Sequence, residues 1–371
     1  MSCRLSSLVV AFGLAGASIG AQTPAAGTGT IFVGSYSGHI TAVDEASGQF
    51  SKVALTTGAP FVVRLSSDRT RFYVQSANQE RFEVVDVARR QSIDSFTLSD
   101  ARRHVRALAF EVDPTHRTMV IVAAPATKQI DRWEIAAPEI ILYDLGTHTV
   151  TRTVPWPLDP EPSYYGVALR FSPDGKLLYV FGTEVTIFDA ATITQVDSWD
   201  LSLPADNALR RLDAGPQDDS ADRPGFVTAL FTTQDAVMKR KTLSVGQIDL
   251  AAKTVDVFPL GPVPDADGLA FTVAPGRKVA NVLVAHIGRH QLWTIDMEAR
   301  RVTRRVDVPT RTRMQMRTSS NGLLYLYEAG RTIEVFSADA STRLRTIELD
   351  SDMMYGTFTI VPAAATAAAP K

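Results

Sequence analysis

Arginine side chains gather in the stretches that join predicted strands, and these stretches supply the first candidate binding residues. The candidates for ligand binding are Arg103, His104, Arg106, Arg211 and Arg313. Guanidinium groups bind carboxylates and phosphates through paired, charge-assisted hydrogen bonds. If the fold brings these stretches to one channel mouth, the residues predict a site for a small anionic ligand. The alternative is that they form ion pairs of little energetic value with acidic residues on the same face, namely Asp206, Asp213, Asp218, Asp219, Asp265 and Asp267.

Aromatic residues form a second candidate site. Trp156, Tyr164 and Tyr165 flank the acidic stretch 159–161, and Trp133 lies in the preceding long connection. Such side chains stack on sugars or anchor a protein partner because they combine a large apolar surface with a polar edge. The alternative is that they pack a long loop onto the fold.

Histidine and cysteine decide which other chemistry is available. His286 and His290 have a spacing that could place two imidazoles on one metal ion, but no nearby carboxylate completes a ligand set. Gly288 between them indicates a turn, which favours two solvated histidines instead. Cys3 is the one cysteine of the chain, and it lies in the segment that we expect to be removed. The mature chain therefore has no thiolate chemistry and no disulfide. We predict no catalytic residue, no metal site and no cofactor.

Aspartate ends six similar short strands along the chain. A tight turn follows each one, and an aspartate there can accept backbone N–H hydrogen bonds in an Asx turn. We therefore expect a structural role for this set, which is Asp44, Asp86, Asp144, Asp189, Asp249 and Asp296.

The spacing of these strands predicts the architecture. The aspartates, and Ser337 in a seventh copy, recur at intervals of roughly 41 to 60 residues, which suits one four-stranded propeller blade with insertions. Strand residues alternate with period 2, and no long helical period is present. The sequence predicts an all-β, seven-bladed β-propeller with four-stranded antiparallel blades.

A second repeated element joins two strands through a turn rich in Asp, Pro, Gly and Ser. Its clearest copy is 170–180, and 65–74 and 317–326 are degenerate copies. Through Leu178-Tyr179-Val180, the Pro-Asp-Gly turn and the following strand that ends in Asp189, the chain resembles the YVTN-type β-propeller repeat proteins (WD40/YVTN repeat-like). The resemblance covers roughly residues 29–362 and implies the fold, since the repeat serves many functions.

The two ends of the propeller are expected to meet. The first copy begins with Thr30 to Val33 and has no inner strand before it, whereas Gly356 to Val361 is an extra strand after the seventh blade. A ring closed by this C-terminal strand, which completes blade one, would pair both exposed edges.

Two further resemblances bear on activity. Blade one, from Ile31 through Asp44 and Gly48 to Pro60, resembles the opening of the seven-bladed lactonase family, which hydrolyses sugar lactones. That family's later basic motif around a Pro-Arg-His step is absent, and the stretch 101–104 matches it only in part. The chain is also similar to the propeller subunits (β-chains) of quinoprotein amine dehydrogenases. Because the mature chain lacks cysteine, that resemblance implies only a noncatalytic partner subunit of a redox dehydrogenase.

Composition and the N-terminus complete the expectations. The chain has 371 residues, of which 45% are hydrophobic, and a formal net charge of -2, which excludes a disordered chain and disfavours a nucleic-acid partner. Arg4, the apolar run from Leu8 and the small residues before Gln22 predict a signal peptide over 1–21. A linker (22–28), the propeller (29–362) and an Ala-rich tail (363–371) follow, and no membrane span is expected in the mature chain.

The long stretches all fall in connections from one blade to the next and from second to third strands, which open on one face of a propeller. Function generally resides on such loops. The sequence thus predicts an exported scaffold, periplasmic or extracellular, that binds a protein partner or small anionic ligand on this face and is noncatalytic. The alternatives are a lactonase-like hydrolase and a redox partner subunit.

Overall fold

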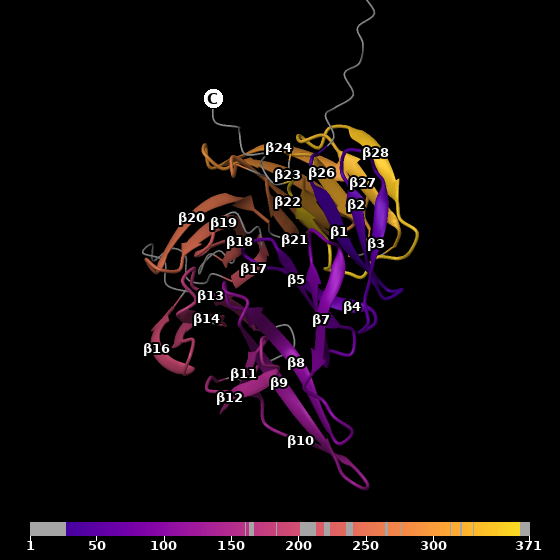
Figure 1. Ribbon diagram of the computed structural model, residues 1–371. Coiled ribbons are helices and arrows are strands. Elements are labelled where there is room, and N and C mark those ends of the chain that lie inside the picture. The colour runs from indigo at the N-terminus through magenta and orange to yellow at the C-terminus, as the bar shows by residue number, and fades with distance from the viewer. Residues whose placement is uncertain are drawn as a thin grey trace, which may run out of the picture.

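The structure, a computed structural model, consists of seven four-stranded blades in a ring (Figure 1). It describes residues 27–159, 161–162, 167–182, 184–200, 213–218, 223–234, 240–263, 266–274, 276–311, 313–319, 321–328 and 330–363. These residues form antiparallel strands and no helix, so the predicted all-β, seven-bladed fold is confirmed. The predicted signal peptide and most of the predicted linker and tail lie outside the described residues. No helix in the described ranges is long and apolar enough to span a membrane.

Each blade runs from an inner strand at the ring axis to an outer strand at the rim. Blade 1 contains β29 (Thr359–Val361), β1 (Thr30–Ser35), β2 (His39–Asp44) and β3 (Phe50–Ala54). Blade 2 contains β4 (Pro60–Leu65), β5 (Arg71–Ser76), β6 (Arg81–Asp86) and β7 (Gln91–Thr97). Blade 3 contains β8 (Arg103–Val112), β9 (Thr118–Lys128), β11 (Glu139–Asp144) and β12 (Thr149–Pro155), with β10 (Trp133–Ile135) added beside β9. Blade 4 contains β13 (Ala168–Phe171), β14 (Leu177–Phe181), β15 (Val185–Asp189) and β16 (Thr194–Trp199).

The remaining blades repeat the order. Blade 5 contains β17 (Asp213–Asp218), β18 (Phe226–Gln234), β19 (Lys241–Asp249) and β20 (Thr254–Pro262). Blade 6 contains β21 (Ala266–Val273), β22 (Val279–His286), β23 (Arg289–Asp296) and β24 (Arg301–Val308). Blade 7 contains β25 (Gln315–Thr318), β26 (Leu324–Tyr327), β27 (Thr332–Phe336) and β28 (Arg343–Glu348).

The ring closes as the sequence predicts, because β29 pairs antiparallel with β1. The paired strand is shorter than expected, and Thr357 anchors the chain before it by accepting a hydrogen bond from the Gly34 amide (2.9 Å). Phe358 is 1% exposed, and its ring stacks on that of Tyr327 of blade 7 with centroids 4.4 Å apart. The C-terminal segment therefore joins the first and last blades.

Apolar side chains fill the space between neighbouring blades rather than one central core. Successive residues of a strand point to opposite faces of the sheet, so Ile31 and Val33 pack toward blade 7, whereas Phe32 packs toward blade 2. The Phe32 and Phe72 rings meet edge to face at 4.9 Å. Seven such clusters each join two adjacent blades, which holds the inner strands in a fixed ring.

The recurring aspartates have the structural role that the sequence predicts. Each accepts at least one backbone N–H of the following turn, for example Asp44 from Ser47 (2.7 Å) and Asp296 from Ala299 (2.8 Å). In every one of these turns the residue four positions later has a positive φ, including Gly48 (72°) and Lys253 (53°). The hydrogen bond from the Thr147 amide is the largest influence on Asp144, and it lowers the pKa of that carboxyl.

Candidate functional site

One face of the propeller carries the connections between blades and between second and third strands. Its most prominent feature is an arm that projects from blade 3 (Figure 1). Strands β8 and β9 continue past the ring, and β10 pairs with the far end of β9. Two stretches that the sequence suggests are long loops, 99–106 and 125–134, therefore lie largely in this three-stranded extension. The sheet extends because β8 pairs with β9 as far as Arg103 and Thr127, and β10 pairs with β9 as far as Lys128.

One face of the arm brings two of the predicted site residues together. His104 and Ile135 both pair with Ala126, from opposite sides of β9, and the His104 ring meets the Trp133 ring edge to face at 4.7 Å. The Nδ1 atom of His104 lies 2.9 Å from a carboxylate oxygen of Glu80 on blade 2. This interaction fixes the imidazole and ties the base of the arm to the neighbouring blade.

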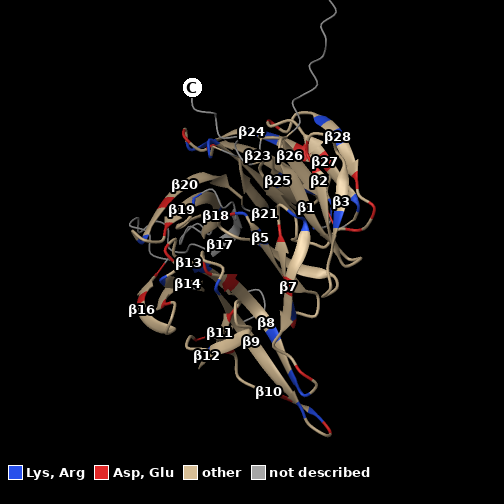
Figure 2. Cartoon of the chain, in the orientation of Figure 1, with Lys and Arg blue, Asp and Glu red and all other residues tan. Residues whose placement is uncertain are grey.

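The arm exposes two further large apolar side chains besides Trp133, the aromatic candidate that the sequence predicts. Trp133 is 46% exposed, Ile135 77% exposed and Ile130 at the tip fully exposed. β10 pairs with β9 along one side and is an edge strand of that sheet in the described structure. The sequence signal for this surface is the isoleucine on either side of Trp133 within a charged segment. Figure 2 shows basic and acidic residues interleaved around the tip.

The predicted arginines have different partners. Arg103 forms an ion pair with Glu139 (2.8 Å), and Arg106 donates to the Gln79 side-chain oxygen (2.7 Å). Arg313 lies across the ring, before blade 7, with its guanidinium 5.9 Å from the centre of the Tyr355 ring. Arg211 falls outside the described residues. Arg103 and Arg106 thus share the blade 3 arm and its base, whereas Arg313 does not join them.

Of the other predicted aromatic residues, the structure describes only Trp156. Trp156 is partly buried against the cluster between blades 3 and 4, and its amide donates to the Pro138 carbonyl (2.9 Å), so it packs the connection onto the fold. Tyr164 and Tyr165 lie outside the described residues. Trp133 is therefore the aromatic candidate that the structure presents to solvent.

The two histidines of blade 6 sit on the hairpin between β22 and β23. His286 lies 3.1 Å from the Gln291 side-chain oxygen, while His290 is 7% exposed. The expectation of two solvated turn histidines is wrong for His290, because blade packing covers it. Within the described ranges no group of three His, Cys, Asp or Glu residues could hold a metal ion.

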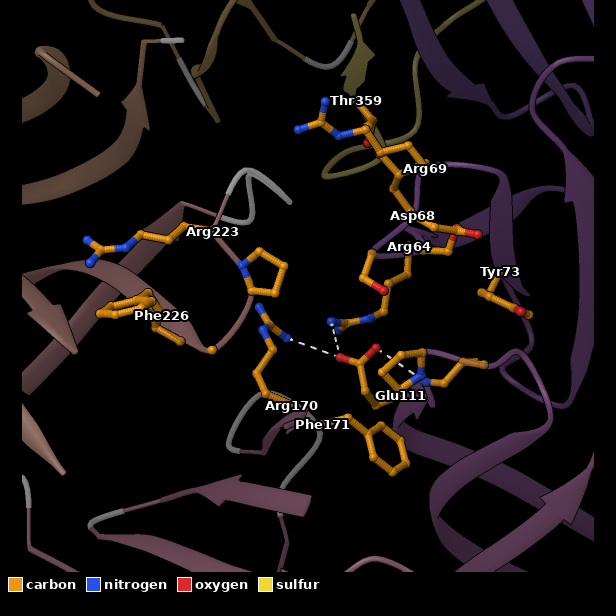
Figure 3. A pocket seen from close by; sticks show the side chains of 18 of the residues that line it. Arg64, Asp68, Arg69, Tyr73, Glu111, Arg170, Phe171, Arg223, Phe226 and Thr359 are labelled. Atoms are coloured by element: carbon orange, nitrogen blue, oxygen red, sulfur yellow. Dashed lines mark hydrogen bonds and ion pairs between the residues drawn. The ribbon is translucent and has the colours of Figure 1, made fainter. Parts of the chain in front are cut away.

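The structure also shows a cluster of charged residues inside the ring that the sequence analysis does not include among its candidates. Arg64, Glu111 and Arg170 come from the inner strands of three successive blades, and Glu111 lies between the two guanidinium groups (Figure 3). The signal was their position in the repeat. Each stands two residues before the residue that opens the first turn of its blade, a place where Arg317 recurs in blade 7.

Comparisons with known proteins bear on the fold. No protein-family model and no curated protein matches the chain. Among solved structures, the chain is similar to Kuenenia stuttgartiensis hydrazine synthase, with 16% identity, a TM-score of 0.50, and coverage of 95% of this chain and 99% of that one. The β-propeller domain of Cps50 (Swd1) from Myceliophteria thermophila gives 12% identity and a TM-score of 0.51, with coverage of 81% and 89%.

Two further solved structures are similar to the chain. The dihydro-heme d1 dehydrogenase NirN gives 11% identity and a TM-score of 0.53, with coverage of 88% of this chain and 74% of that one. A functionally unknown protein from Desulfotomaculum acetoxidans gives 12% identity and the same score, with coverage of 91% and 100%. At these identities the likeness concerns the fold alone, and it agrees with the seven-bladed β-propeller described above.

Proposed function

We propose that this chain is an exported, noncatalytic β-propeller of the YVTN type whose blade 3 arm binds a protein partner. The observation that carries the proposal is the arm itself. Trp133 and Ile135 are exposed on β10. Ile130 is exposed on the turn that precedes this strand, at the tip of the arm.

Apolar exposure of this kind favours a partner. Burying one large apolar side chain completely contributes about 1.5 to 3 kcal/mol, and clustered apolar residues rimmed by charges are typical of interaction sites. Arg132 and Glu134 beside Trp133 provide that polar rim. Tryptophan is also among the residues that most often dominate binding energy.

The arm is held rigidly, which supports binding at low entropic cost. The pairing of β8 with β9 continues to Arg103, and the Asp100 carboxylate accepts the amides of Arg102 and Arg103, both at 2.7 Å. The contact of His104 with Glu80 adds a link to blade 2. A partner would therefore meet a surface that needs little ordering.

Co-purification from the source cells tests the proposal. Trp133→Ala combined with Ile135→Ser should remove the partner that co-purifies with the unaltered chain. Val196→Ser is the matched control, because Val196 is 56% exposed on the outer strand of blade 4. A partner that is retained by the arm variant, or lost equally from the control, would contradict the proposal. Capture of a redox enzyme would identify the partner-subunit alternative.

Export is proposed from the N-terminal sequence. The positive residue Arg4, the apolar run and the small residues before Gln22 have the order of a secretory signal. Mass spectrometry of the chain from fractionated cells should find an N-terminus near Gln22 in the exported fraction. An intact Met1 terminus in the cytoplasmic fraction would refute export.

A further inference from the structure

A cavity of about 640 Å³ occupies the centre of the ring and opens between the first turns of the blades, away from the face of the predicted loops. Residues from the inner strands or first turns of all seven blades line it. Strand β8 carries His104 on the arm and Glu111 in this cavity. The seven positions from His104 to Glu111 put the two places about 23 Å apart at the usual rise of an extended strand.

The wall of the cavity carries an excess of positive charge. Its charged residues are five arginines and three carboxylates, a formal surplus of two positive charges, and they are Arg64, Arg69, Arg170, Arg223, Arg317, Asp68, Glu111 and Asp113. Two of the carboxylates accept hydrogen bonds from residues of the turns in which they lie. Asp68 accepts hydrogen bonds from Ser66 and Thr70, and Asp113 accepts the amides of Arg117 and Thr118.

Glu111 alone stands between two of these arginines. Its Oε2 atom lies 3.0 Å from Nη1 of Arg64 and 3.4 Å from Nη1 of Arg170 (Figure 3). The three side chains are 14 to 27% exposed, so water screens them less than it would surface pairs. One carboxylate oxygen therefore contacts two guanidinium groups, and Nη1 of Arg170 also donates to the Leu169 carbonyl (2.8 Å). The forked donors of a guanidinium suit the paired oxygens of an anion.

A buried donor at the same place remains unused. The Nε atom of Arg64 is buried and has no hydrogen-bond partner among the described residues. Leaving a buried donor unpaired is energetically unfavourable, because the donor has lost water without gaining a partner. An oxyanion that reached this guanidinium would supply that partner.

Apolar side chains complete the wall. Val62, Phe171, Val273 and Ile360 line the cavity together with Phe226. The guanidinium carbon of Arg223 lies 3.5 Å from the centre of the Phe226 ring, which holds a positive group at the mouth. The cavity therefore suits an organic anion with an apolar portion better than a bare inorganic ion.

We propose that this cavity binds a small organic anion with two or more acidic oxygens, such as a polycarboxylate or a phosphate monoester. Arg64 and Arg170 bind the oxyanion, and Glu111 competes with it for the same guanidinium donors. This site is separate from the arm, and it does not depend on the protein-binding function.

Isothermal titration at low salt tests the proposal, with citrate and glycerol phosphate as the carboxylate and phosphate probes and inorganic phosphate as the bare ion. We expect a Kd below about 1 mM for at least one organic probe, weakening as salt is added. Arg64→Gln and Arg170→Gln should each weaken binding about tenfold. Arg103→Gln, which breaks a comparable pair with Glu139 on the arm, should change it less than twofold.

Glu111→Gln should change the affinity in the opposite direction from the arginine variants. This variant therefore tests whether Glu111 competes with the anion for the two guanidinium groups. Removing the internal carboxylate should tighten binding at least threefold. Arg317→Gln provides a second cavity variant if Arg64→Gln melts early. Absence of binding by every probe, equal loss in Arg103→Gln, or weaker binding by Glu111→Gln in a folded protein would overturn the proposal.

Discussion

If the C-terminal segment closes the ring, truncating the side chain of Phe358 should destabilise the protein by a predictable amount. Phe358 is 1% exposed and stacks on Tyr327. Truncating a buried phenylalanine to alanine costs about 3 to 5 kcal/mol, because it removes apolar burial and leaves a cavity. At roughly 2 °C per kcal/mol for a domain of this size, Phe358→Ala should lower Tm by about 6 to 10 °C.

Thermal denaturation followed by circular dichroism measures this shift. Ile287→Ala is the control, since Ile287 is 89% exposed at a hairpin tip and its truncation should move Tm by less than about 1 °C. Deleting residues 356–361 should destabilise more than the point change, because it also unpairs the inner edge of β1. An unchanged Tm in both the deletion and Phe358→Ala would refute the closure.

Three other predictions concern buried carboxylates, acid stability and catalysis. Glu45 is fully buried between blades 1 and 7 and accepts the Tyr325 hydroxyl at 2.9 Å, so Glu45→Ala should cost about 3 kcal/mol in urea unfolding; a loss below about 1 kcal/mol would contradict this. Partial burial alone would raise the pKa of Asp68, but hydrogen bonds from Ser66 and other neighbours outweigh it and hold that pKa well below its usual range. The resulting stabilisation is complete above pH about 4 and declines as the pH falls toward the folded-state pKa. Asp68→Asn should therefore cost about 1 kcal/mol at pH 7, with a difference that shrinks in acid, and a constant difference would refute the assignment. Purified protein should not turn over common sugar lactones, whereas saturable hydrolysis that His104→Ala or Arg106→Ala abolishes would establish the lactonase alternative.

Much of the fold could be predicted because it is encoded locally and repeatedly. An aspartate such as Asp189 ends a strand and satisfies the amide of the next turn within three residues, so the sequence records the turn directly. The intervals between copies then predict the blades, and the unpaired strand at each end predicts closure. The extent of β29 differed, because Thr357 replaces the ladder with a side-chain bond to Gly34, and blade 3 carries the added strand β10.

The candidate site was harder to predict because its contacts join distant positions. Whether Arg103 meets a ligand or an ion-pair partner depends on the extension of β8, which places Glu139 within 2.8 Å. A long connection that continues as strand cannot be distinguished by length from an irregular loop. Arg64 and Arg170 occupy one repeat position, but only the closed ring shows that Glu111 lies between them.

Site-specific photo-crosslinking tests protein binding by the arm most directly. A photoreactive amino acid at the position of Ile130, which is fully exposed at the tip, should yield one discrete adduct in the source cells. The same group at Val150, which is 48% exposed on the outer strand of blade 3, should yield none. Irradiation that gives no adduct from Ile130, or the same adducts from both positions, would contradict a binding role for the arm.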